Sequence, residues 1–230
     1  FAAHDLRPNA FAPAYGLAEA TLLACTKPHG QAVTLLQVDA AHLSEGRVLT
    51  VPRGTTGSRC LVSSGVPVAG VTLRVGNVEP QGPVRSNEVG EIWLAGSSVG
   101  AGYWGDAEET SSSFGLTLAG TQGLAFFRTG DLGFVHEDQV YVTGRLKDML
   151  IIHGRNVYPQ DVEWTVERAH GALRAGYGAV VSTQGDEGEL LVVVQEVERR
   201  AQDGDLALLL DVEDQRRAGE VVPGRRLAQQ

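Results

Sequence analysis

Alternation of apolar and polar residues predicts that most of this chain forms short β-strands. In the first two thirds the pattern covers residues 71–75, 90–96, 134–136 and 140–142. The last two of these runs flank Glu137-Asp138, which predicts a hairpin. Two later runs, residues 177–183 and 190–197, predict a second pair of strands joined by a polar, glycine-containing turn.

Helical patterns are fewer and shorter, and they are expected at residues 17–24, at 40–43, after Asp106 and after Pro159. Asp106 is followed three residues later by Glu109, which is typical of a helix N-cap. Pro159 suits the first position of a helix because its missing N–H would have no partner there.

The pattern of charged and apolar residues changes at residues 144–159. Gly144 opens a charged run that ends at Asp148, four apolar residues follow, and Gly154 and Pro159 punctuate the rest. We interpret this stretch as a hinge between two domains. The predicted fold class is α/β plus α+β: residues 1–143 end a large domain, and residues 144–230 form the hinge and an incomplete small α+β lid domain. Within the large domain, residues 1–30 end an α/β subdomain and residues 31–143 form a β-rich subdomain.

Composition excludes several classes of protein. The net charge of −9 gives no electrostatic footprint for nucleic acid. The two cysteines form no C-x-x-C pair, and the six histidines lack metal-ligand spacing. No apolar run approaches the roughly 18 residues of a membrane span, and the first residues do not resemble a signal peptide. We therefore expect a cytoplasmic protein without a membrane span. The lysines, Lys27 and Lys147, are the only two in the chain.

Three polar motifs are candidates for chemistry, and each has a plain structural alternative. Glu19 falls in the first turn of a predicted helix, where a carboxylate complements the helix dipole. Asp131 follows Thr-Gly, where a loop aspartate often closes an Asx turn on its own backbone. Residues 53–58 look like a phosphate loop, but neither a lysine nor a helix follows, so we interpret them as a turn between strands.

Taken in order, four blocks of sequence resemble the adenylate-forming superfamily of acyl-CoA synthetases, luciferases and nonribosomal-peptide adenylation domains. The blocks are residues 15–19 (Y-G-L-A-E), residues 90–93 continuing to 102–104, residues 128–131 (R-T-G-D), and residues 144–148 continuing to 154–156 and Pro159. The resemblance covers roughly residues 10–197, and each block taken alone is a weak signal.

Within the superfamily the chain looks most like a C-terminal fragment of a fatty acyl-AMP ligase. Ala18 stands where CoA ligases more often carry Thr or Ser, and an extra segment at about residues 33–59 is similar to the insertion typical of these ligases. A fatty acyl-CoA ligase and a non-catalytic remnant of the fold remain alternatives.

The resemblance implies the activation of a fatty acid with ATP to acyl-AMP. The acyl group then passes to the phosphopantetheine thiol of an acyl carrier protein or a polyketide synthase module. In matching positions, Tyr15 and Gly16 would bind the nucleotide, with the Tyr15 ring facing adenine. Glu19 would ligate Mg²⁺, Asp131 would bind the ribose hydroxyls, and Arg145 would add a cationic donor.

The last block implies roles in domain motion. Lys147 occupies the hinge position, with an ordinary surface lysine as the alternative. Gly154 and Asn156 fall in the loop that faces the acceptor, although Gly154 is also a plausible turn residue. The family's phosphate loop would precede residue 1, and its catalytic lysine is absent, because no lysine follows Lys147. We therefore expect the isolated chain to have negligible adenylation activity.

Overall fold

The computed structural model describes residues 5, 7–77, 87–121, 123–152, 155–185 and 188–198. The chain divides into two compact units, Phe1–Tyr158 and Pro159–Gln230, which are described separately. This division lies C-terminal to the boundary expected at residues 143/144, and the hinge at Lys147 stays a prediction. No helix among the described residues is long and apolar enough to cross a lipid bilayer.

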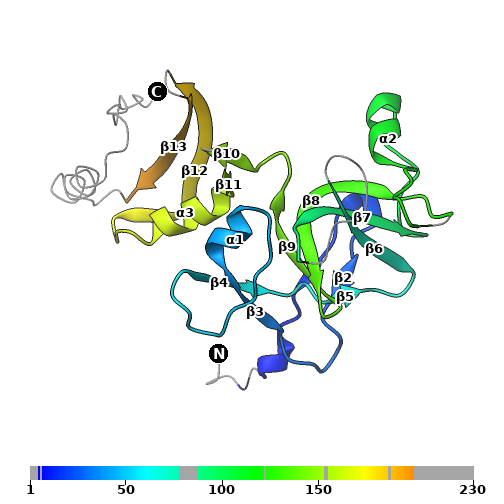
Figure 1. Cartoon of the computed structure of the whole chain (residues 1–230), viewed down its shortest axis with the longest axis horizontal. Helices are drawn as coiled ribbons and strands as arrows, with labels where there is room; N and C mark the ends of the chain where they lie inside the picture. The colour runs from blue at the N-terminus through cyan, green and yellow to red at the C-terminus, as the bar shows by residue number, and fades with distance from the viewer. Residues whose placement is uncertain are drawn as a thin grey trace. The chain divides into compact units, whose positions relative to one another are not determined.

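A four-stranded antiparallel sheet dominates the first unit (Figure 1). Its strands, in spatial order, are β6 (Val71–Gly76), β7 (Gly90–Gly96), β8 (Phe127–His136) and β9 (Gln139–Arg145). These strands cover all four runs in which alternation predicted strands. β8 and β9 form the predicted hairpin, and Glu137 and Asp138 take positive φ angles of 48° and 60° in its turn. Two central residues with positive φ suit the twist of a two-residue hairpin loop.

The central strand β7 is buried along nearly its whole length because it packs on both faces. Successive side chains of a strand point to opposite faces. Ile92 and Leu94 therefore join a core with Leu73 and Val140. Trp93 joins Phe126 on another cluster, with ring centroids 6.5 Å apart in an edge contact.

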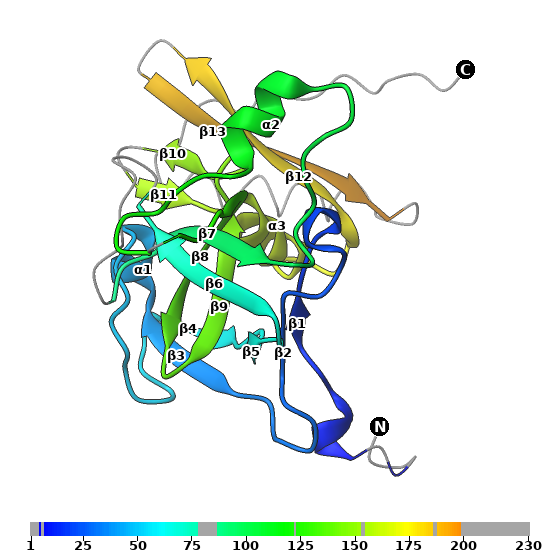
Figure 2. The same cartoon turned by 90° about the vertical axis from the view of Figure 1, so that its right-hand side faces the viewer.

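The N-terminal part forms a small three-stranded sheet of β1 (Ala14–Tyr15), β2 (Cys25–Thr26) and β5 (Val66–Pro67), visible beside the main sheet in Figure 2. A single 3-10 turn, η2 (Pro8–Ala10), precedes it. The helix predicted at residues 17–24 is wrong, because only a 3-10 turn forms there, η3 (Ala18–Ala20). The chain must reverse to pair β2 with β1, and Thr21 takes a φ of 71° where a helix would continue.

The segment predicted as an insertion forms a strand–helix–strand part of the first unit. It contains β3 (Leu35–Asp39), α1 (Ala40–Ser44) and β4 (Ser58–Val62), with β3 and β4 antiparallel. Residues 53–57 form a loop leading into β4, which begins at Ser58, in agreement with the turn interpretation. Val38, Leu43 and Leu61 pack with Phe134 and Tyr141, so this segment rests against the β8–β9 hairpin.

The helix α2 (Ala107–Ser113) begins as predicted, and the Asp106 side chain accepts a hydrogen bond from Glu109 N at 2.9 Å. None of its residues is buried. After β9 a short hairpin of β10 (Leu150–Ile152) and β11 (Arg155–Val157) completes the first unit.

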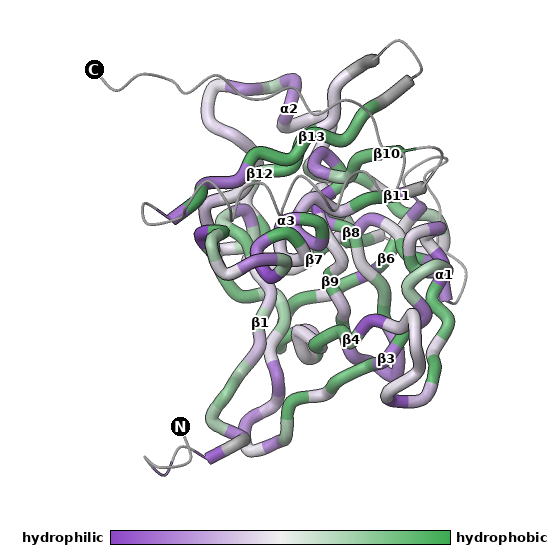
Figure 3. Tube along the Cα trace, turned by 90° about the vertical axis from the view of Figure 1, so that its left-hand side faces the viewer, coloured by the Kyte–Doolittle hydropathy of each residue, from purple (hydrophilic) through white to green (hydrophobic). Residues whose placement is uncertain are grey.

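The second unit consists of α3 (Pro159–Glu167) with the strands β12 (Leu173–Gly185) and β13 (Gly188–Val197). The helix from Pro159 and both late strands were predicted. Val180 N donates to Glu163 Oε1 at 3.0 Å, which ties the helix to β12. Much of β13 is hydrophobic, as the green colour of the strand in Figure 3 shows. Some of its apolar side chains are exposed, among them Val194 at 61%. The sequence from residue 199 lies outside the described residues.

Candidate functional site

Asp131 is hydrogen-bonded to two other residues that were predicted to bind nucleotide. It lies on β8 and is only 5% exposed. Its Oδ2 accepts a hydrogen bond from the Tyr15 hydroxyl at 2.7 Å, and its Oδ1 accepts one from Arg145 Nε at 3.1 Å. The structure therefore brings Tyr15, Asp131 and Arg145 together.

The sheet explains this meeting. Asp131 and Arg145 are direct partners in the β8–β9 ladder, so hairpin register alone places them side by side. Tyr15 comes from the end of β1, 116 residues away from Asp131 in the sequence. The site is thus assembled from one local pair and one distant residue.

The Asx-turn interpretation of Asp131 is wrong for the described structure. The carboxylate bonds to side chains from other strands, while the local bond is made by Thr129, whose Oγ1 accepts from Asp131 N at 3.0 Å. The Thr129 hydroxyl also donates to the Ile92 carbonyl at 2.8 Å, which ties this part of β8 to β7. A carboxylate has about four lone-pair sites, so two bonds leave Asp131 able to accept more.

Tyr15 is a neutral donor in this arrangement. Burial raises the pKa of its phenol well above the ordinary value, and the negative Asp131 acts in the same direction. The hydroxyl therefore keeps its proton at neutral pH. The structure shows this bond to Asp131, whereas a stacking role of the ring toward adenine stays a prediction.

Gly16 has a steric reason to be glycine. A Cβ at this position would lie 1.6 Å from the carbonyl oxygen of Leu22, because the chain folds back over it. Ala24 N donates to the Tyr15 carbonyl at 2.9 Å in the same reversal. Its part in nucleotide binding stays a prediction.

Glu19 lies in the three-residue turn η3. The interpretation that it complements a helix dipole is therefore wrong, because no helix forms there. Its Oε1 accepts a hydrogen bond from the Tyr103 hydroxyl at 2.8 Å. Sequence reasoning gave Tyr103 no role, although the residue lies in one of the family blocks. That block was the signal that could have singled it out.

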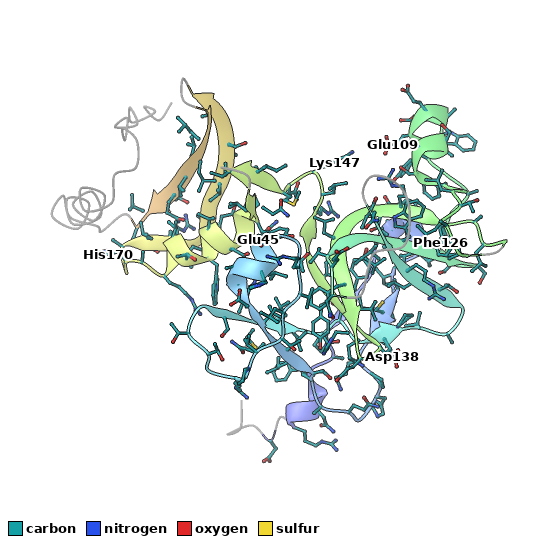
Figure 4. All side chains as sticks on the ribbon, in the orientation of Figure 1. Glu45, Glu109, Phe126, Asp138, Lys147 and His170 are labelled. Atoms are coloured by element: carbon teal, nitrogen blue, oxygen red, sulfur yellow. The ribbon has the colours of Figure 1, made fainter. Side chains whose placement is uncertain are left out.

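A cavity of about 460 Å³ is lined by three of the predicted residues, Glu19, Arg145 and Lys147. Leu17 and Tyr103 line it together with Glu109 and two serines of α2. The remaining walls are Glu91, residues 128–130, Leu146 and Asp148. Asp131 does not line this cavity, but it is hydrogen-bonded to Arg145, which does. Figure 4 shows Glu109 on α2 and Lys147 at the exit of β9, at the opposite end of the hairpin from Asp138.

An ion pair between Glu91 and Arg128 supports the part of β8 that carries Asp131, and sequence reasoning missed it. Glu91 is 2% exposed and accepts bonds from Arg128 Nε at 2.9 Å and from Gly130 N at 3.1 Å. Arg128 also lies over the Trp93 ring, 5.5 Å from its centroid. Glu91 is the second residue of β7 and belongs to the family block that begins at residue 90. Nothing in the distance along the sequence between this block and the R-T-G-D block predicts that Glu91 pairs with a residue there.

The two lysines have different environments. Lys27 is 8% exposed, and its Nζ donates to the carbonyl oxygens of Asn9 at 3.2 Å and Gln31 at 2.6 Å, which is a structural use. Lys147 is exposed and lines the cavity. Asn156 lies in β11, opposite Ile151, and Gly154 lies outside the described residues.

The site suits a cation that is shared with a ligand. Within the described residues, no cluster of three or more His, Cys, Asp or Glu side chains could hold a metal ion. Mg²⁺ in nucleotide sites usually takes one or two carboxylates, and phosphate oxygens and water complete its shell. Glu19 at the cavity wall fits that pattern as a single protein ligand.

Comparison with known proteins shows what the chain resembles. Residues 2–104 match the family model of AMP-binding enzymes. A solved fatty acid AMP ligase from Legionella pneumophila is 36% identical and superposes with a TM-score of 0.62, covering 92% of this chain and 36% of that one. The predicted resemblance to adenylate-forming enzymes is thereby confirmed, in sequence and in fold.

Particular relatives are similar over most of the chain. A medium-chain-fatty-acid–[acyl-carrier-protein] ligase, JamA of Moorena producens (strain JHB), is 42% identical over 204 residues, covering 88% of this chain. A putative fatty-acid–CoA ligase, fadD21 of Mycobacterium leprae (strain TN), is 40% identical over 204 residues, covering 87% of this chain. The chain spans 34% of the length of each of these two relatives.

Proposed function

We propose that this chain is part of a fatty acyl-AMP ligase, which activates a fatty acid with ATP to form acyl-AMP and pyrophosphate. The observation that carries the proposal is the hydrogen-bonded group of Tyr15, Asp131 and Arg145, because its Arg145 lines a cavity together with Glu19 and Lys147. The name of the Legionella relative, a fatty acid AMP ligase, supports the same substrates.

In this proposal the residues bind and orient rather than react. Asp131 accepts hydrogen bonds from the ribose hydroxyls, because its bonds to Tyr15 and Arg145 hold the carboxylate still and leave acceptor sites open. Arg145 is 68% exposed, so its charge is available to the anionic nucleotide. Glu19 holds Mg²⁺, which would offset phosphate charge when bound. Positioning of this kind supplies much of the catalysis in phosphoryl-centre chemistry.

The acceptor of the acyl group is the finer part of the proposal. The name of the Moorena relative favours an acyl carrier protein, whose phosphopantetheine thiol takes the acyl group. The sequence resemblance is the ground for a polyketide synthase module as acceptor, for Lys147 as hinge, and for Gly154 and Asn156 beside the acceptor. The cytoplasmic location is proposed from the sequence composition. The name of the Mycobacterium leprae relative favours CoA instead, so a fatty acyl-CoA ligase is the second candidate.

A chimera tests the proposal directly. The matching third of the Legionella ligase is replaced by this chain, and fatty-acid-dependent exchange of labelled pyrophosphate into ATP is measured. We expect exchange in the chimera and a loss of at least about tenfold in the Asp131→Asn chimera, since a hydrogen bond to a charged group contributes about 1.5–3 kcal/mol. A folded chimera without exchange would contradict the proposal and favour a non-catalytic remnant.

The acceptor is tested with the same chimera, which is offered holo-acyl carrier protein and CoA in parallel. Acylated carrier protein as the main product supports the first candidate, and acyl-CoA supports the second. For the 230-residue chain alone we expect nucleotide binding with negligible adenylation, because it lacks a lysine after Lys147.

A further inference from the structure

A hydrogen bond between Tyr103 and Glu19 lies at the border of two cavities. Both residues line the 460 Å³ cavity described above, and both also line a second cavity of about 320 Å³ that includes Ser98, Gly100 and Phe114. The phenol comes from a segment 84 residues from Glu19 in the sequence. Sequence proximity therefore does not explain the contact, and the fold must hold the two side chains together.

Tyr103 is fixed by its surroundings independently of Glu19. Its backbone N–H donates to Thr110 Oγ1 of α2 at 2.8 Å. Its ring meets Phe114 in an edge contact with centroids 5.2 Å apart, and Phe114 packs on Phe127 at 4.4 Å. Phe127 begins β8, the strand that carries Asp131. The phenol is thus attached to the same framework as the nucleotide residues.

Glu19 has a weaker framework of its own. It lies in a single 3-10 turn, and Thr21 leaves that turn with a positive φ. The Glu19 carbonyl accepts from Gly100 N at 2.8 Å, so its backbone is tied to the segment that leads to Tyr103. The carboxylate therefore gains its orientation from the tyrosine hydroxyl.

We propose that Tyr103 is a positioning residue, whose hydroxyl holds Glu19 Oε1 and presents the carboxylate to a divalent cation on the nucleotide phosphates. This inference rests on the proposed function. Partners that orient a metal ligand typically change metal affinity about 10–100-fold when they are removed.

The test measures Mn²⁺, an EPR-active substitute for Mg²⁺, bound by the full 230-residue chain in the presence of ATP. We expect Tyr103→Phe to lower the Mn²⁺ affinity by about tenfold or more. The ring contacts with Phe114 remain in this variant, so its melting temperature is expected to match that of the wild type. Trp104→Phe is the matched control, because Trp104 is the adjacent aromatic residue and is fully exposed; its affinity is expected to be unchanged.

Glu19→Gln separates this inference from the proposed function. If Glu19→Gln loses Mn²⁺ affinity while Tyr103→Phe retains it, the positioning role is wrong and the metal role of Glu19 stands. If the wild type shows no ATP-dependent Mn²⁺ binding, or Glu19→Gln binds as the wild type does, the metal site itself is wrong and the role of Tyr103 is overturned with it.

Discussion

Two carboxylates on neighbouring strands have different tasks in this site. Asp131 bonds to an exposed arginine and a tyrosine, and it retains acceptor sites for a ligand. Glu91 accepts hydrogen bonds from two protein groups, the Arg128 guanidinium and the Gly130 N–H. These bonds fix the backbone of β8 just before Asp131. Asp131 is thus free to make the ribose contact proposed above, whereas Glu91 has a structural role.

Glu91→Ala is expected to destabilise the first unit strongly. The change leaves Arg128, whose side chain is 23% exposed, without its ion-pair partner. Breaking a buried pair typically costs about 3–5 kcal/mol, and the partial exposure of Arg128 places the expected loss near 3 kcal/mol of unfolding free energy. Urea unfolding followed by tryptophan fluorescence measures it, since Trp93 is buried next to the pair.

Glu45→Ala is the matched control for this prediction. Glu45 pairs with Arg47, and both side chains are at least half exposed, so the expected loss is below about 1 kcal/mol. Equal losses in the two variants would show that the Glu91 pair has no special structural weight.

At the residue scale, the sequence predicted Tyr15, Glu19, Asp131 and Arg145 through ordered family blocks. The structure joins Tyr15, Asp131 and Arg145 by hydrogen bonds, and Arg145 lines one cavity with Glu19. The sequence did not predict Glu91 or Tyr103. Their importance comes from partners 37 and 84 residues away, and such pairings depend on strand order and packing rather than on local pattern.

The elements were predictable where a local signal decides the conformation. The cap at Asp106, the proline at Pro159 and the turn at Glu137-Asp138 all carry such signals, and each predicted element formed. Residues 17–24 failed because their helical spacing competes with a tertiary demand: β2 must return to pair with β1. The long-range ladder prevails over a weak local preference.

The short helix α1 is expected to depend on pH through its cap. Asp39 Oδ1 accepts from His42 N at 2.9 Å, and chiefly this bond lowers the pKa of Asp39. A lowered pKa in the folded state adds stability above the unfolded value of about 3.9, and this stability is lost as the pH falls through the folded value. The protection factors of the His42 and Leu43 amides, which compare the observed exchange rate with the intrinsic rate at the same pH, should therefore fall below about pH 4.

Asp39→Asn provides the control for α1. Asparagine caps helices about as well as aspartate but does not titrate. The acid-dependent loss of protection should vanish in this variant, while protection at neutral pH stays similar. A loss of protection in acid that persists in Asp39→Asn would mean that another group is responsible.

At the scale of the whole molecule, the chain has two compact units. The first unit buries residues from strands far apart in sequence, among them Cys25, which is fully buried. Burial raises the pKa of the Cys25 thiol to about 12, whereas Cys60 is exposed on β4. The two thiols therefore differ in access and, for Cys25, in the fraction of reactive thiolate.

Cys25 is expected to react with a thiol reagent only when the first unit unfolds. At pH 8 the native chain should show one fast thiol, and Cys60→Ser should remove it. A raised pKa stabilises the fold below the unfolded value of about 8.5, so stability should decline as the pH rises above that value. Fast modification of Cys25 in the folded chain, measured by mass spectrometry, would contradict the described core.

The bond between Tyr15 and Asp131 closes a loop of 116 residues, and this has a consequence for folding kinetics. Contacts between residues so far apart form late, after local hairpins such as β8–β9. Interactions that are absent from the folding transition state act on the unfolding rate rather than on the folding rate. A nucleotide bound at this junction is therefore expected to slow unfolding and to leave refolding nearly unchanged. The lifetime of the folded first unit, more than the speed with which it forms, would then follow the supply of ATP.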